Sequence, residues 1–135
     1  FNVHDGLGMF LLNKAGIKSV IITARLSRVV KRRASDMRVS AVYSNHDKLK
    51  MYKKVLKRFR VKDEEVCFMG DELLDLPVLK RAGLAVAPPN AVEEVKNIVH
   101  YVTRRYGGKG AVREIIEIIL KSQGLWDKVI TGYMR

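Results

Sequence analysis

Residues 66–75 read Val-Cys-Phe-Met-Gly-Asp-Glu-Leu-Leu-Asp, and this stretch decides the fold. Its apolar start, residues 66–69, predicts a short buried strand, because strand-favouring residues run straight into a Gly-Asp turn. A short helix over about residues 76–82 follows, closed by Gly83. A strand that passes through a polar turn into a helix is the unit from which α/β domains are built.

The same alternation extends to both sides of this stretch. Helices are predicted at residues 6–15, 27–37, 47–59, 91–98 and 110–120, and strands at residues 18–22, 41–43, 84–87 and 101–103. Ser27 is a suitable N-cap for the second of these helices. The pattern predicts one α/β domain over residues 1–120, with a mostly parallel sheet and ligands at the carboxyl ends of its strands.

Residues 121–135 form a C-terminal tail after the last predicted helix. The tail carries four large apolar or aromatic side chains, Trp126, Val129, Ile130 and Tyr133. Such residues at a chain end indicate docking, either on a neighbouring subunit or back on the same domain. We expect the subunit contact.

The composition is that of a folded, soluble protein. The chain has 135 residues, of which 47% are hydrophobic and 30% are charged, and this balance excludes intrinsic disorder. No apolar run is long enough to span a bilayer, and no segment has the layout of a signal peptide. The single cysteine, Cys67, forms no internal disulfide, so we expect a cytoplasmic setting.

The positive charge is concentrated in one stretch. The formal net charge is +12, and residues 25–62 hold 14 Lys and Arg but only two acids. Such a block can bind nucleic acid, an anionic membrane surface or phosphorylated molecules. The alternative is that the basic side chains form the solvated faces of amphipathic helices.

Polar residues follow three of the predicted strands. Thr23 follows the first strand, Lys48 follows the second, and Asp71 and Asp75 follow the third. In a parallel sheet these positions converge on one crevice. A hydroxyl and an ammonium bind phosphate oxygens there, and a carboxylate holds a hard cation such as Mg²⁺. The set therefore predicts phosphoryl transfer, although each member taken alone could be a helix cap or a surface charge.

Five blocks of the sequence resemble, in order, those of the 3-deoxy-D-manno-octulosonate 8-phosphate phosphatases, a family of the haloacid dehalogenase superfamily. The blocks are residues 1–8 (Phe-Asn-Val-His-Asp-Gly-Leu-Gly), 21–25 (Ile-Ile-Thr-Ala-Arg), 47–48 (Asp-Lys), 69–78 (Met-Gly-Asp-Glu-Leu-Leu-Asp-Leu-Pro-Val) and 101–114 (Tyr-Val-Thr-Arg-Arg-Tyr-Gly-Gly-Lys-Gly-Ala-Val-Arg-Glu). The resemblance covers residues 1 to about 123. It implies a Rossmann-like sheet without a large cap, a cytoplasmic homotetramer, and Mg²⁺-dependent hydrolysis of a phosphate ester in lipopolysaccharide sugar synthesis.

The resemblance also implies roles for single residues. Thr23 is similar in position to the hydroxyl that binds phosphate, Lys48 to the lysine that steadies a phosphoaspartyl intermediate, and Asp71 to the Mg²⁺ ligand. Asp75 is similar to an acid that orients a metal-bound water or Lys48. Further positions that it offers for substrate or subunit contacts are Asp5, Gly6, Ala24, Arg25 and Arg113.

The chain departs from the family pattern at the nucleophile. The superfamily places its nucleophile in an Asp-x-Asp block on a central strand before all the blocks above, and these 135 residues contain no Asp-x-Asp. We therefore expect the central first strand to be absent from this chain, which leaves the chain inactive alone. Alternatives are a phosphatase for a nonulosonate 9-phosphate, a non-catalytic phosphatase-like domain, and a basic nucleic-acid-binding module.

Overall fold

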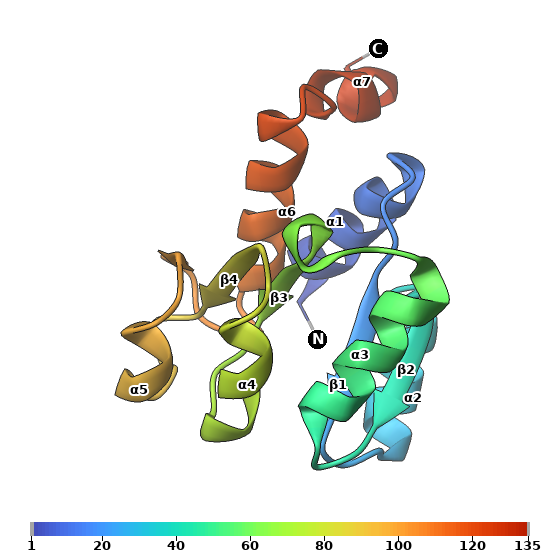
Figure 1. The fold of residues 1–135 in the computed structure, drawn as a ribbon. Coiled ribbons are helices and arrows are strands. Elements are labelled where there is room, and N and C mark those ends of the chain that lie inside the picture. The colour runs from blue at the N-terminus through green and yellow to red at the C-terminus, as the bar shows by residue number, and fades with distance from the viewer. Residues whose placement is uncertain (1, 135) are drawn as a thin grey trace.

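The computed structural model describes residues 2–134 (Figure 1). Phe1, which opens the first block of the resemblance, and Arg135, the last residue of the tail, lie outside the described residues. The helices are α1 (Val3–Lys14), α2 (Arg28–Asp36), α3 (Lys48–Phe59), α4 (Leu76–Leu79), α5 (Glu93–Lys96), α6 (Ala111–Ser122) and α7 (Trp126–Ile130). The strands are β1 (Val20–Thr23), β2 (Ala41–Ser44), β3 (Cys67–Met69), β4 (Leu84–Ala87) and β5 (Tyr101–Val102). Three short 3₁₀ turns are η1 (Asp63–Glu65), η2 (Leu73–Asp75) and η3 (Thr131–Tyr133).

The strands form two parallel sheets, where the sequence predicts one. β1 pairs with β2 in the first sheet, and β4 lies between β3 and β5 in the second. The sheets are separate because, among residues 2–134, β1 pairs only with β2 and β3 pairs only with β4. The predicted α/β class, with parallel strands flanked by helices, is confirmed.

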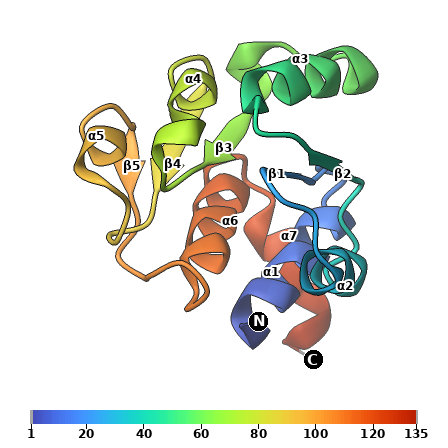
Figure 2. The ribbon, with the colours of Figure 1, turned by 90° about the horizontal axis from the view of Figure 1, so that it is seen from below.

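Helices cover both faces of each sheet. Figures 1 and 2 together show α3 on one face of the β1–β2 sheet and α2 on the opposite face. In Figure 2, α4 and α5 lie on one side of the β3–β4–β5 sheet and α6 lies on the other. The chain crosses from the first sheet to the second through α3 and η1.

Burial of the strands follows the number of their strand neighbours. Residues 85–87 of β4, which has a strand on each edge, are fully buried. All four residues of β1 are only partly buried, and so are Phe68 and Met69 of β3, while Cys67 is exposed. The burial predicted for residues 66–69 is therefore incomplete in β3, which, like β1, pairs with one strand only among residues 2–134.

The tail packs on its own chain. α7 contributes the buried Val129 to a cluster that α1 and α6 also form: Met9, Leu11, Leu12, Ile116, Leu120 and Val129. Trp126 and Ile130 pack against this cluster. Tyr133 and Met134 stay 58% and 79% exposed, so the subunit contact expected of the tail now depends on them and remains a prediction.

Helix boundaries differ from the expected ones by a few residues. α1 begins at Val3 because the Asn2 side chain accepts hydrogen bonds from the backbone N–H groups of His4 and Asp5. α4 ends at Leu79 instead of residue 82, and α5 covers only Glu93–Lys96 of the predicted 91–98. At the ends of both short helices, backbone N–H groups donate hydrogen bonds to the carbonyl three residues back, as Ile98 N–H does to the Val95 carbonyl. Such hydrogen bonds tighten the last turn of a helix. Ser27 caps α2 as predicted, with its hydroxyl accepting from Val30 N–H.

A polar network joins α3 to the start of the second sheet. The hydroxyl of Tyr52, a residue that is 1% exposed, donates to Asp63 Oδ1 at 2.7 Å. Arg81 pairs with Asp63 at 3.3 Å and stacks over the Tyr52 ring. Burial, followed by the hydrogen bond to Asp63, raises the pKa of Tyr52, and that hydrogen bond lowers the pKa of Asp63. The network therefore links the two halves of the fold.

Replacing Tyr52 with phenylalanine is expected to lower the free energy of unfolding by about 1.5 kcal/mol, because a hydrogen bond to a charged partner is lost. Since the pKa of Asp63 is held below its ordinary value of 3.8, the deficit should be present at neutral pH and shrink below about pH 4 as the carboxylate is protonated. Urea unfolding at several pH values measures it. Tyr43→Phe, which removes an exposed 3.3 Å contact with Arg58, is the control and should change stability by less than about 0.5 kcal/mol. Equal effects of the two changes would contradict the prediction.

No helix formed by residues 2–134 has both the length and the apolar character that crossing a bilayer requires.

Candidate functional site

The carboxyl ends of β2 and β3 meet at an ion pair. Lys48 is the first residue of α3, four positions after β2 ends, and Asp75 closes the turn that follows β3. Lys48 Nζ lies 2.6 Å from Asp75 Oδ1, and the two side chains are 15% and 3% exposed. The expected convergence of polar residues at the strand ends is therefore present for this pair, which joins the two sheets.

Asp75 organises the loop that leaves β3. Its second oxygen, Oδ2, accepts hydrogen bonds from the backbone N–H groups of Asp71 and Glu72 at 2.9 and 3.1 Å. The first oxygen is left for Lys48. The carboxylate thus fixes the loop with one oxygen and the ammonium with the other. The hydrogen bond to Asp75 therefore fixes the position of the Lys48 ammonium at the carboxyl ends of the strands, where a charged donor can bind an anion.

Gly70 makes this arrangement possible. A Cβ atom at position 70 would lie 2.5 Å from the Asp75 Cβ and 2.9 Å from its Oδ2. Any other residue would therefore push the carboxylate out of place. Sequence reasoning treated Gly70 only as part of a block, although a glycine directly before the first aspartate is the signal that would have shown its steric role.

Asp71 differs from Asp75 in being exposed. Its backbone N–H donates to Asp75 and its carbonyl accepts from Val92 N–H, while its side chain makes no hydrogen bond to another residue in the 2–134 range. A rigid backbone therefore carries a free carboxylate beside the Lys48–Asp75 pair.

The donor set can be tested against the Mg²⁺ that the resemblance implies. Mg²⁺ uses one or two carboxylates and keeps several waters. Asp71 fits as one such ligand, because its carboxylate is free and exposed, whereas that of Asp75 is occupied. Over residues 2–134 no three His, Cys, Asp or Glu side chains gather into a metal site. The residues present therefore supply a partial donor set.

Thr23, Ala24 and Arg25 form a turn of their own at the end of β1. The Thr23 hydroxyl donates a hydrogen bond to the Arg25 carbonyl at 3.0 Å, and it accepts one from the Arg25 backbone N–H at 3.3 Å. No hydrogen bond within the described range joins this turn to Lys48 or Asp75. The turn also follows the end of a strand, and the hydroxyl is hydrogen-bonded within this turn instead of to the ion pair.

Asp5 and Arg113 meet elsewhere. The Asp5 side chain, buried at 5% exposure, accepts a hydrogen bond from Arg113 N–H at 2.9 Å. Gly110, the N-cap of α6, has no side chain to do this, so Asp5 caps α6 from α1. Gly6 follows on α1, and the Arg113 guanidinium pairs with Glu117 at 3.2 Å. Asp5 and Arg113 thus form a contact between α1 and α6, and no hydrogen bond within residues 2–134 joins them to Lys48 or Asp75.

Known proteins share this fold. The model of the haloacid dehalogenase-like hydrolases matches residues 32–116. The 3-deoxy-D-manno-octulosonate 8-phosphate phosphatase of Yersinia pestis is 39% identical over 124 residues, which are 91% of this chain and 66% of that protein. The enzyme of the same name from Escherichia coli K12 is 35% identical over 129 residues, 95% of this chain and 69% of that protein.

Solved structures agree. The crystal structure of the same phosphatase from Moraxella catarrhalis, in complex with magnesium, phosphate and KDO, superposes with a TM-score of 0.95 at 36% identity, covering 98% of this chain and 77% of that one. The cobalt-bound phosphatase of Haemophilus influenzae gives a TM-score of 0.88 at 34% identity, covering 92% and 73%.

The parallel α/β fold and the polar strand ends, together with the family match, define the class as a haloacid dehalogenase-like hydrolase. Within that class, the chain belongs to the 3-deoxy-D-manno-octulosonate 8-phosphate phosphatase family. The resemblance seen in the sequence is confirmed. The family's class of activity is the hydrolysis of phosphoric monoesters, and the chain spans 66% to 69% of these two relatives.

Proposed function

We propose that these 135 residues, together with further polypeptide that supplies the nucleophile, hydrolyse a sugar-acid phosphate, 3-deoxy-D-manno-octulosonate 8-phosphate, with Mg²⁺. The two parts together are called the complete protein below. The observation that carries this proposal is the Lys48–Asp75 ion pair beside the free Asp71 carboxylate, after the carboxyl ends of β2 and β3, which belong to the two different sheets. The names of the relatives, and the magnesium, phosphate and KDO bound by the Moraxella catarrhalis enzyme, support the substrate and the cation.

Each residue has a proposed task in phosphate chemistry. The Lys48 ammonium binds the phosphoryl oxygens and balances their growing charge, and Asp75 keeps it in position. The Thr23 hydroxyl, after turning away from Arg25, binds a second oxygen, with Ala24 and Arg25 lining the approach. Asp71 would hold Mg²⁺, which when bound supplies Lewis-acid polarisation of the phosphate. Asp5 and Arg113 support the contact between α1 and α6, and Gly6 adjoins Asp5 on α1.

The nucleophile is proposed to come from polypeptide outside these 135 residues. Phosphoryl transfer through an aspartyl intermediate needs a carboxylate that no Asp-x-Asp supplies here. The free edges of β1 and β3, and the incomplete burial of their apolar side chains, support a further strand between them that carries it. Without that strand the chain binds phosphate but does not turn over.

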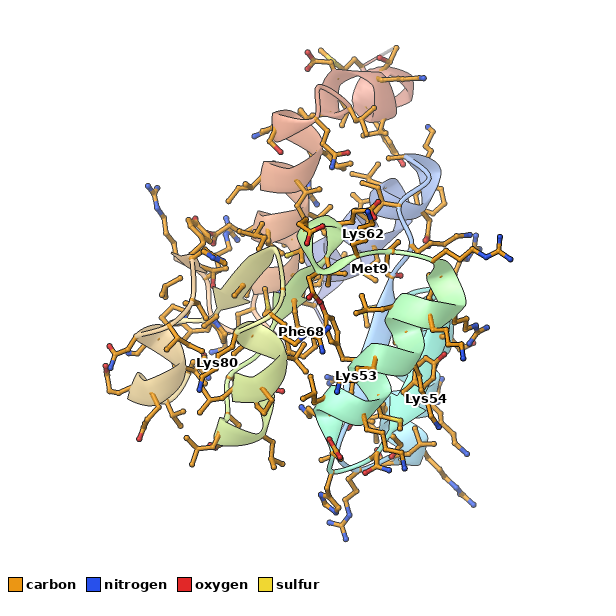
Figure 3. The ribbon with its side chains drawn as sticks, viewed as in Figure 1. Met9, Lys53, Lys54, Lys62, Phe68 and Lys80 are labelled. Atoms are coloured by element: carbon orange, nitrogen blue, oxygen red, sulfur yellow. The ribbon has the colours of Figure 1, made fainter. Side chains whose placement is uncertain are left out.

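Other uses are less well supported. Ten of the 14 Lys and Arg residues in the range 25–62 lie on α2 or α3. These two helices lie on opposite faces of the β1–β2 sheet, so one continuous nucleic-acid footprint is not favoured (Figure 2). Figure 3 shows two of these lysines, Lys53 and Lys54, both on α3. A nonulosonate 9-phosphate phosphatase, or a non-catalytic phosphatase-like domain, fits the same fold.

We further propose that the complete protein is a cytoplasmic homotetramer, with Tyr133 and Met134 in a subunit contact.

The test is phosphate release by the complete protein and by the 135-residue chain, with the octulosonate 8-phosphate and a nonulosonate 9-phosphate as substrates. We expect Mg²⁺-dependent release by the complete protein, with the larger kcat/KM for the octulosonate ester, and none by the 135 residues alone. Turnover by the 135 residues would overturn the external nucleophile. A larger kcat/KM for the nonulosonate ester would replace the substrate, and inactivity of the complete protein on both would favour the non-catalytic domain.

A further inference from the structure

A second polar pocket lies away from the Lys48–Asp75 cluster, between β5, the start of α1 and one face of α6. Its volume is about 570 Å³, and it opens to solvent. Its walls are cationic, polar and partly apolar: His4, Tyr101, Arg104, Arg105, Arg113, Glu114, Glu117, Ile118 and Lys121. None of Thr23, Lys48, Asp71 and Asp75 lines it.

One of its two carboxylates is already fully used. Glu114 accepts hydrogen bonds from the backbone N–H groups of Arg104 and Arg105 at 3.0 Å and from the Tyr101 hydroxyl at 2.6 Å. Burial raises the pKa of Glu114, but these hydrogen bonds outweigh it and hold the pKa below its usual value. Glu114 therefore stays ionised and fixes the backbone of the two arginines, and the nearby Arg104 charge also helps to hold its pKa down.

The other carboxylate is shared by two different cations. Glu117 accepts from Arg113 Nε at 3.2 Å and lies 3.5 Å from Lys121 Nζ. Trp126 faces both of these cations from the other side. The Glu117 carboxylate is therefore already paired with Arg113 and Lys121.

Neither Arg104 nor Arg105 is in an ion pair with a residue of the described range. The Arg105 side chain is packed over Gly110, where a Cβ atom would come within 2.8 Å of the Arg105 Cδ. Gly110 has a φ of +107°, in the left-handed region, so a glycine there serves both the turn and the close approach. Two adjacent arginines thus border one pocket on a fixed backbone.

We propose that this pocket binds the oxyanion group of a small organic molecule, a carboxylate or a phosphate, through Arg104 and Arg105. Guanidinium groups pair with such oxyanions through two parallel hydrogen bonds, which are stronger than neutral ones. Ile118 and the Tyr101 ring supply apolar surface for the organic part of the ligand. The site is distinct from the proposed catalytic cluster, so it accommodates a second anion beside the substrate.

The test uses the complete protein with Lys48→Met, which removes the phosphate contact of the catalytic cluster. The affinities for pyrophosphate and for citrate are measured by calorimetry at an ionic strength of about 0.15 M. In the parent protein the bound probe is located by NMR, through the Nε–H signals of Arg104 and Arg105. We expect at least one probe to shift these signals, and the double change Arg104→Gln, Arg105→Gln to weaken its binding by about tenfold or more. Preference for pyrophosphate or for citrate identifies the phosphate or the carboxylate as the natural group.

The matched control is Lys53→Gln, Lys54→Gln, which removes the same charge from α3 (Figure 3). It should change the affinity by no more than about twofold, because exposed distant charges are screened. Equal weakening by both double variants would overturn the proposal in favour of unspecific attraction. Absence of binding by both probes would overturn it as well. If Arg104→Gln, Arg105→Gln instead altered the oligomeric mass measured by light scattering, the pocket would be a contact with a second copy and the proposal would be wrong.

Discussion

Replacing Asp75 with alanine is expected to lower the free energy of unfolding by about 3 kcal/mol or more, because it leaves the mostly buried Lys48 ammonium without its partner. In the parent protein the Asp75 carboxylate accepts hydrogen bonds from the backbone N–H groups of Asp71 and Glu72, and the same change leaves both groups without this partner. It also removes the tie between the end of β2 and the end of β3. Urea unfolding of the complete protein measures the loss.

Asp75→Asn separates the structural role from the positioning role. The amide keeps the volume and can still accept from the two N–H groups, so the stability loss should be smaller than for alanine. It cannot hold the Lys48 charge, so kcat should fall with either substitution. Glu94→Gln, at an exposed position on α5, is the control and should stay within about 0.5 kcal/mol of the parent protein. A stable Asp75→Ala protein with unchanged kcat would refute both roles.

The meeting of Lys48 and Asp75 could be expected from the sequence for a physical reason. In parallel sheets the chain leaves every strand at the same edge, so residues that follow successive strands come together whatever their separation in the chain. Lys48 and Asp75 are 27 positions apart and still pair at 2.6 Å. The same reasoning placed Thr23 at this edge. It could not predict that the hydroxyl would turn back to Arg25, because a local turn competes with the site for the same donor.

Other features depend on more than one element and left no pattern in the sequence. Tyr52 reads as one apolar position of an amphipathic helix, and only the fold brings it to Asp63 and Arg81. The role of Glu114 depends on the chain returning after β5, so its hydrogen bonds to the Arg104 and Arg105 backbone could not be inferred from spacing. The tail posed a similar problem, because apolar residues do not reveal which surface they cover.

Replacing Asp71 with asparagine is expected to lower the Mg²⁺-dependent kcat of the complete protein by about 100-fold or more, since Lewis-acid stabilisation contributes several kcal/mol. Stability should change little, within about 0.5 kcal/mol, because the Asp71 side chain is exposed and makes no hydrogen bond within residues 2–134. This pattern differs from that expected for Asp75, where stability falls as well as kcat. The measurements are phosphate release against Mg²⁺ concentration, Mg²⁺ binding by calorimetry, and urea unfolding.

Glu72→Gln is the matched control for Asp71→Asn, because it removes the same charge from the next residue. Its side chain accepts a hydrogen bond from Leu73 N–H at 2.8 Å, and a glutamine oxygen can accept the same bond. We therefore expect Glu72→Gln to keep near-normal Mg²⁺ affinity and activity. If Asp71→Asn kept them and Glu72→Gln lost them, Glu72 would be the ligand and the assignment of Asp71 would be wrong. The comparison is decisive because the two carboxylates share a loop, a net charge and a backbone that Asp75 fixes for both.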